Sequence, residues 1–381
     1  MGRLLLAIGI AFLLLDRADA LTAANVQESL CGKPLGRVVL QDSWMEGGWG
    51  IRVVIPAGRY PARVNRFESR KLIDQLTGIK SARWVMLNLT APSFGGMFTA
   101  PDKILLKEVS SKMAPRIDLL SYYIDRLRAE GYRIVLYVAS QGPSLGFLKR
   151  KRIQRMKRSQ AGYFKDLVDI NKSWKSYLER RGVSNEKAFA EVIERYSRKY
   201  GKKIDGWWFD HGVHGNPELY INAAKAGNPR ALVAWIGRHE IFKEYRGAPP
   251  IWLLTRGTPL ADYTDGHVSP TKKNGNGNVP WWPGNEWLIR QVENCARVSG
   301  AIPHVFSPLQ STWRSGKEAF PKRKALDWTL RVVEAGGGIT WAAALATPEY
   351  SKPEIDERVY RVLKAIDSGV LKRIGFRVER R

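Results

Sequence analysis

A carboxylate with two histidines close behind it stands at the end of an apolar run in the middle of the chain. Residues 204–210 read IDGWWFD, and His211 and His214 follow Asp210 within four positions. A catalytic nucleophile needs such a place, because a buried strand holds it rigid and the aromatic residues before it strengthen its charge. We expect Asp210 to be a nucleophile. A helix cap or an ion pair with a basic loop residue remains the alternative.

Short β-branched runs alternate with amphipathic helical stretches along most of the sequence, and one such run would position Asp210. About eight β–α steps follow one another without a low-complexity linker, which favours a (β/α)₈ barrel of the TIM type over an open doubly wound sheet. The expected strands are 50–55, 84–89, 132–139, 204–210, 231–236, 261–264, 302–306 and 339–342. In such a barrel the carboxyl ends of the strands form the active face, so Asp210 would face a cleft and Asp205, at the strand's start, would be structural.

Two long segments follow predicted strands and would form the walls of that cleft. We expect residues 140–185 to be a loop, with seven basic residues in ten at 149–158. The second segment, 265–284, is rich in Gly, Asn and Pro and carries Trp281 and Trp282. Both tryptophans are candidate platforms for the apolar faces of sugars, although loop anchoring would explain them equally well.

The strand that ends in Asp210 resembles the nucleophile strand of the α-L-fucosidase family of glycoside hydrolases. Weaker similarity extends over about residues 45–345, in the segments 94–101, 118–137 and 228–235 and in the glycines before Ile339. The resemblance implies a barrel enzyme that cleaves O-glycosyl bonds with retention of configuration. The histidines that follow the first two strands in that family have no counterpart here, so the sugar-binding residues differ.

The resemblance also implies a second carboxylic acid that protonates the leaving oxygen, in a variable loop beyond the nucleophile. Residues 260–267, LADYTDGH, occupy that region. Asp265 is favoured over Asp262, because it lies past the short strand and next to Gly266. Glu240 ranks behind both, and His267 is an alternative proton donor or a substrate ligand. In a retaining enzyme the two groups would lie about 5 Å apart.

The remaining site predictions concern substrate binding and metals. His211, His214 and His267 would contact the sugar. We add Trp208 and Asn88, which belong to strands predicted to lead into the cleft. No HExxH motif, calcium loop or cysteine cluster is present, and Gly212 separates the two histidines after a strand, so we expect neither a metal nor another cofactor.

The charge of the chain indicates the kind of substrate. Sixty-two Lys and Arg against 36 Asp and Glu give a net charge of +26, which attracts polyanions. For an exported protein this favours a polysaccharide that carries sulfate or uronate groups, and nucleic acid is not expected as a partner. General solubility is the alternative explanation of the charge.

Export is predicted from the first residues. Residues 1–20 combine Arg3, an apolar stretch of about twelve residues and the small-residue site Ala18-Asp19-Ala20, which is typical of a cleaved signal peptide. We predict a secreted or periplasmic protein with no stable membrane insertion after cleavage, a lead-in at 21–48 and one catalytic domain at 49–381. Cys31 and Cys295 could pair outside the cytosol, but sequence alone does not show that they meet.

Three functions stay open at this point. The first is a secreted glycoside hydrolase that acts on an anionic, fucose-containing polysaccharide through Asp210. A polysaccharide lyase on the same scaffold would use His211 or His267 as its base. A protein that binds carbohydrate or nucleic acid without turnover would use the barrel as a platform only.

Overall fold

The computed structural model describes most of the chain beyond its amino-terminal segment. The described residues are 31, 43–58, 69–92, 94–146, 153–154, 157–158, 161–236, 241–242, 251–252, 254–267, 272–274, 277–279, 282–313, 320–346 and 353–374. The predicted signal peptide, Glu240, Trp281 and most of the basic run at 149–158 lie outside these ranges. The predicted domain boundary at residue 49 falls within the first strand, which begins at Gly48.

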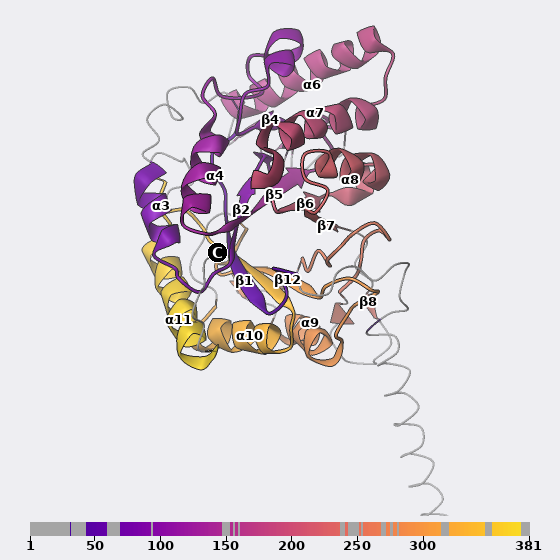
Figure 1. Cartoon of the computed structure of the whole chain (residues 1–381). Helices are drawn as coiled ribbons and strands as arrows, with labels where there is room; N and C mark the ends of the chain where they lie inside the picture. Colours follow the sequence, from indigo (N-terminus) through magenta and orange to yellow (C-terminus); the bar gives the residue numbers. More distant parts are fainter. Residues whose placement is uncertain are drawn as a thin grey trace, which may run out of the picture.

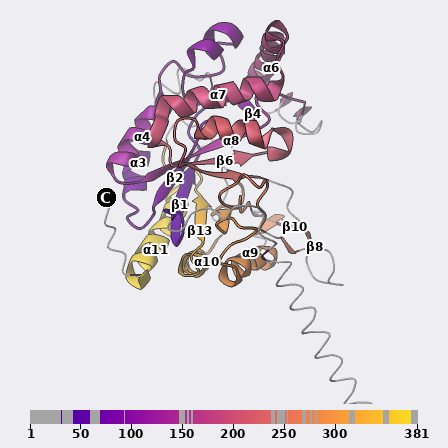
Figure 2. The same ribbon diagram turned by 45° about the vertical axis from the view of Figure 1, so that its right-hand side comes forward.

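Seven parallel strands form one curled sheet with helices around it (Figures 1 and 2). Their order across the sheet is β12-β13-β1-β2-β5-β6-β7. The strands are β1 (Gly48–Val53), β2 (Trp84–Asn88), β5 (Arg133–Ala139), β6 (Gly206–Asp210), β7 (Leu232–Trp235), β12 (His304–Pro308) and β13 (Gly338–Ala342). The surrounding helices are α3 (Ser69–Thr77), α4 (Leu119–Ala129), α6 (Ala161–Arg181), α7 (Asn185–Tyr200), α8 (Pro217–Lys225), α9 (Trp282–Asn294), α10 (Lys322–Glu334) and α11 (Glu357–Ile374).

The gap between β7 and β12 is closed by a segment too irregular to count as a strand. Tyr263 makes parallel bridges to Ala234 of β7 and to Ile302, and His267 makes one to Phe306 of β12. Through these bridges the segment takes the place of the eighth strand of the barrel. The predicted (β/α)₈ barrel is therefore confirmed. None of the helices in the described part of the chain is both long and apolar enough to cross a membrane.

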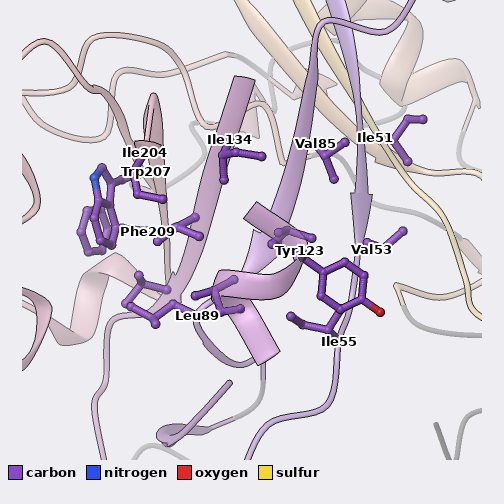
Figure 3. Close-up of a cluster of buried hydrophobic side chains, with 14 of the residues drawn as sticks. Ile51, Val53, Ile55, Val85, Leu89, Tyr123, Ile134, Ile204, Trp207 and Phe209 are labelled. Carbon is purple, nitrogen blue, oxygen red and sulfur yellow. The ribbon is translucent and has the colours of Figure 1, made fainter. Parts of the chain in front are cut away.

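Alternation along the strands divides the core into two layers, because successive side chains of a strand point to opposite faces. One layer lies between the sheet and the helices, and Figure 3 shows part of it, with Val53 and Ile55 beside Tyr123 of α4. The other layer fills the barrel and includes Trp84, Tyr137 and Trp208. In β6, Trp207 and Phe209 therefore pack against the helices, and only Trp208 shares the interior with Asp210. The prediction that all three rings surround Asp210 is wrong for two of them.

Short strands and a π-helix lie in the segments that follow the carboxyl ends of the sheet strands. A hairpin of β3 (Thr90–Ala91) and β4 (Phe94–Phe98) follows β2, and a π-helix spans Leu105–Val109. Beyond β7 lie the strand pairs β8 (Ile241–Phe242) with β9 (Ile251–Trp252) and β10 (Lys272–Asn274) with β11 (Gly277–Val279).

The segment 140–185, predicted to be a loop, is largely helical. Helix α6 buries Leu167, Ile170, Trp174 and Tyr177, whose spacing of three and four residues places them on one face. Lys112 anchors this helix through Asp166 at 2.8 Å and Asp169 at 2.6 Å. Much of this segment is therefore a packed and anchored helix.

Candidate active site

Asp210 is the last residue of β6 and its side chain points into the barrel at the carboxyl end of the strands. One carboxylate oxygen accepts a hydrogen bond from the backbone amide of His211 at 2.8 Å. The other accepts one from the hydroxyl group of Tyr137, on the neighbouring strand β5. The side chain is 13% exposed, so the carboxylate is held firmly and still reaches the surface. This is the position that the sequence predicts for it.

The turn after Asp210 is strained. His211 has a φ of 56°, a left-handed conformation that few residues other than glycine adopt, and such strain concentrates at functional sites. Gly212 follows, and a Cβ there would lie 2.3 Å from the carbonyl oxygen of Ile236, so the turn packs against the end of β7. The ring Nε2 of His211 lies 3.4 Å from Asp210 Oδ2 and 3.4 Å from the carbonyl oxygen of Pro92. The imidazole therefore borders the carboxylate directly.

His214, the other predicted sugar ligand on this turn, ends a short 3₁₀ helix at Gly212–His214 and is half-buried. Partial burial and the neighbouring His211 lower the pKa of His214. The pKa shift favours an uncharged imidazole, which can donate and accept hydrogen bonds to sugar hydroxyls.

A stack of rings connects Asp210 with the segment that closes the barrel. The ring of Tyr137 lies on Trp208 at 5.4 Å between centroids, and Trp208 lies on His267 at 5.9 Å. On its other side His267 stacks on Trp313 at 4.4 Å. Trp208 also donates its indole N–H to the carbonyl oxygen of Asp265 at 2.9 Å. Trp208 is itself fully buried, so it supports the site from below and does not present a sugar platform.

Arg52 contacts both ends of this stack of rings, namely Tyr137 and Trp313. It lies on β1 with only 2% of its surface exposed, and its guanidinium sits 5.2 Å from the centre of the Tyr137 ring. It also donates a hydrogen bond to the carbonyl oxygen of Trp313 at 3.0 Å. One buried cation therefore contacts both the tyrosine that binds Asp210 and the residue whose ring covers His267.

Asp265 is close to this group but buried. It is 1% exposed, and its Oδ1 accepts a hydrogen bond from the backbone amide of His267 at 2.9 Å. Gly266 between them has a φ of 62°, and a Cβ there would lie 2.1 Å from the carbonyl oxygen of His304. Asp265 thus shapes a tight turn that presents His267, which is only half-buried. The geometry favours His267 over Asp265 as the group that reaches a substrate.

Asp262 lies away from Asp210, at the opposite end of the barrel. Its Oδ2 accepts a hydrogen bond from the amide of Val233, near the start of β7, and pairs with Lys225 at 2.8 Å. An aspartate bound in this way cannot contact a sugar that is attacked by Asp210. The reason is register: Tyr263 faces the interior, so Asp262 faces the helices.

Asn88 also has a different place from the one predicted. It is fully buried, and its amide binds the backbone of Ile55 and Thr90, so it fastens the ends of β1 and β2 and has no surface for a sugar. Trp282 is the first residue of α9, and Trp287 is half-buried in the same helix, with Arg290 over its ring at 5.5 Å. No group of three His, Cys, Asp or Glu side chains converges as metal ligands would among the residues that the structure describes.

Three residues of the site were not predicted from the sequence, namely Arg52, Tyr137 and Trp313. Each lies on a different segment from Asp210, and only the pairing of the strands brings them together. A signal was present for two of them, because Arg52 and Tyr137 interrupt apolar strands with a polar group, and a buried polar group in a strand of a barrel commonly faces the interior site.

The sequence is similar to a known family of enzymes. A family model for the endo-alpha(1,4)-fucoidanase Mef1 matches residues 39–252 and 250–374. No curated protein matches the sequence.

Solved structures share the fold at low sequence identity. The endo-fucoidan hydrolase P5AFcnA from glycoside hydrolase family 107 matches with a TM-score of 0.70 and 18% identity over 85% of this chain and 91% of that chain. The endo-fucoidan hydrolase MfFcnA4 of the same family gives 0.67 and 18% over 86% of this chain, which spans only 53% of that longer chain. Alpha-L-fucosidase isoenzyme 1 from Paenibacillus thiaminolyticus gives 0.50 and 14% over 86% of this chain and 74% of that one.

Proposed function

The chain belongs to the family of the endo-alpha(1,4)-fucoidanase Mef1 and is a glycoside hydrolase, and from this membership we propose that it cleaves internal α(1→4) bonds of a sulfated fucan. The resemblance to α-L-fucosidases holds at the level of the fold, and a fucose-containing substrate is proposed from the fucoidanase family. The sequence left exo and endo action open, and the family favours endo action. The net charge of +26 supports an anionic polymer as the substrate.

The observation that carries the mechanism is the setting of Asp210. Its carboxylate would attack the anomeric carbon while the glycosidic C–O bond breaks, which gives a covalent glycosyl-enzyme. Tyr137 and the His211 amide fix both oxygens, so the attacking atom does not have to be oriented during the reaction. Water would then release the sugar with retained configuration.

We assign proton transfer to His267, with Asp265 as the residue that holds the turn. An acid must give its proton to the leaving oxygen and take one from the water in the second step. The half-buried imidazole of His267 is accessible for this, whereas the Asp265 carboxyl group is 1% exposed. The aromatic rings of Trp208 and Trp313 on either side of it fix the plane of the imidazole.

Export of the enzyme is part of the proposal. A disulfide joins Cys31 to Cys295 across 264 residues of sequence, and such bonds persist in oxidising compartments. This supports a secreted or periplasmic location for an enzyme whose polymeric substrate cannot enter a cell. The signal peptide at residues 1–20 remains a sequence prediction.

The central test is the change of Asp210 to Asn, measured on a purified sulfated fucan. We expect Asp210→Asn to lower kcat by about 10³-fold or more, because the amide cannot attack, while polymer binding is retained. Wild-type enzyme should release oligosaccharides of several sizes with new reducing ends. The same change at the other end of the strand, Asp205→Asn, is the control and should keep kcat. Asp210→Asn with near wild-type activity, or wild-type products that absorb as unsaturated sugars, would contradict the proposal.

The assignment of the acid is tested with leaving groups of different acidity. His267→Gln should lower kcat/KM for the fucan by about 10²-fold or more, but should change it little for an oligosaccharide with a nitrophenolate leaving group, which departs without a proton. Asp265→Asn should affect both substrates alike and lower the melting temperature. If Asp265→Asn instead spares only the nitrophenyl substrate, Asp265 is the acid and the assignment to His267 is wrong.

A further inference from the structure

A hollow of about 320 Å³ opens between α3 and α4 on the outer wall of the barrel, away from Asp210. Figures 1 and 2 both show these two helices side by side. The hollow is lined by Arg70, Ile73, Asp74, Tyr122 and Arg126. Its volume is at the lower end of the range for sites that bind small molecules. The function described above makes no use of it.

One side of the hollow reaches toward the end of the barrel that carries Asp210. Each helix of a (β/α)₈ barrel begins at the end where the preceding strand finishes. Arg70 lies in the first turn of α3 and Tyr122 in the first turn of α4, whereas Asp74 lies past the middle of α3 and Arg126 in the last turn of α4. A polymer that crosses the rim beside β1 and β2 would therefore meet Arg70 and Tyr122 first.

Tyr122 gives the hollow an aromatic wall. It is 40% exposed, and it is the one aromatic residue among the exposed large hydrophobic side chains of the described part of the chain. Arg126 lies one helical turn further on, with its guanidinium 5.5 Å from the centre of the ring. The apolar face of a pyranose can stack on such a partly exposed ring.

Two guanidinium groups supply the charge. The side chain of Arg70 is 89% exposed, and its Nε lies 4.0 Å from Asp74 Oδ2, so this exposed ion pair contributes little. Arg70 and Arg126 can therefore both donate to an oxyanion, and a planar guanidinium matches the paired oxygens of a sulfate ester. Ile73, which is almost fully buried, provides an apolar floor.

We propose that this hollow is a secondary binding site for a sulfated sugar unit of the polymer, separate from the catalytic cleft. The sugar face would lie against Tyr122, and its sulfate would accept hydrogen bonds from Arg126 and Arg70. Binding one stretch of a long chain here raises the effective concentration of another stretch at the cleft. The inference rests on the proposed function for the identity of the polymer.

The test measures binding without turnover, in the Asp210→Asn background. A variant with Arg70→Gln, Tyr122→Ala and Arg126→Gln is compared with a control that removes the same charge and a similar exposed surface elsewhere, Arg198→Gln, Leu219→Ala and Arg373→Gln. Affinity electrophoresis in gels that contain sulfated fucan gives the dissociation constants. We expect the hollow variant to bind about tenfold more weakly, because one of two linked contacts is lost, and the control to change less than about twofold.

Substrate length provides a second measurement in the active enzyme. With Asp210 intact, the hollow variant should show a raised KM for the polymer and an unchanged kcat/KM for a short fucan oligosaccharide that cannot span both sites. Equal losses in the hollow variant and the control would mean that overall charge binds the polymer and would overturn the proposal, as would unchanged binding by the hollow variant. Loss of binding in a protein that hydrolyses no fucan would support this site while contradicting the proposed activity.

Discussion

Strand β6 has an aspartate at each end, and the two are held in opposite ways. Asp205, just before the strand, is buried and pairs with Arg128 at 2.6 Å and Arg133 at 2.9 Å. Asp210, at the far end, is held by the neutral hydroxyl of Tyr137 and by a backbone amide. Two cations satisfy the first carboxylate completely, whereas the second keeps its charge available for reaction.

The segment that lies between β7 and β12 repeats the contrast. Asp262 forms an ion pair with Lys225 near the start of β7. Asp265 instead accepts a hydrogen bond from the backbone amide of His267, toward the end of the barrel that carries Asp210. The amino end of the barrel also carries the disulfide between Cys31 and Cys295. One end of the barrel is thus built for stability and the other for chemistry, as the (β/α)₈ architecture separates them.

The sharpest test of this comparison is the same isosteric change at both ends of β6. Asp205→Asn should lower the free energy of unfolding by about 2 kcal/mol, because it removes the charge that Arg128 and Arg133 share and weakens the bond to the Ile134 amide. Asp210→Asn should leave the free energy of unfolding unchanged or slightly higher, since no cation loses its partner. Urea denaturation of both variants measures the difference.

The comparison would be broken if the order were reversed. A larger loss of stability in Asp210→Asn than in Asp205→Asn would show that the catalytic end contributes more to folding than its contacts suggest. Activity per folded molecule provides the internal control, because Asp205→Asn should keep it below the denaturation midpoint.

The fold and the first catalytic residue could be predicted because both depend on local pattern. Apolar runs such as YRIVLYVA at 132–139 predict buried strands from local sequence alone. Asp210 ends another such run, and this places it at the carboxyl end of its strand. The length of the segment 140–185 favoured a loop, so helix α6 was missed although Leu167, Ile170 and Trp174 have helical spacing.

The other site residues depend on information that the sequence does not contain. Asp262 and Asp265 lie on the short segment that completes the barrel. A shift of one residue along such a segment moves a side chain from the barrel interior to the layer between the sheet and the helices. Arg52 contacts Tyr137, and His267 contacts Trp313, across segments that are far apart in the sequence. Cross-strand register produces these contacts, and no single segment reveals it.

A smaller test concerns His304, the first residue of β12, whose side chain is fully buried. Burial lowers the pKa of His304 to about 3, and its Nε2 lies 2.8 Å from the hydroxyl oxygen of Thr340, which also accepts the indole N–H of Trp84. The hydroxyl can still donate its own proton to Nε2, and such a bond would suit a neutral imidazole.

The pKa of His304 in the folded state lies below the value of about 6.5 expected in the unfolded chain, so the unfolded state binds more protons as the pH falls. Stability that is present above pH 6.5 is therefore lost as the pH falls toward 3. Between pH 7 and 5.5 we expect the free energy of unfolding to drop by about 1 kcal/mol from this residue, measured by urea denaturation.

His304→Gln is the matched variant, because glutamine can hydrogen-bond to Thr340 without titrating, and it should flatten the dependence on pH. His214, whose pKa is also lowered, contributes in the same direction from the catalytic end, so His214→Gln is made in parallel. His214 is half-buried and His304 is fully buried, and the pH dependence should follow that burial. If His214→Gln flattened the curve more than His304→Gln, the pH-sensitive part of the fold would lie at the catalytic end, against the division of roles drawn from β6.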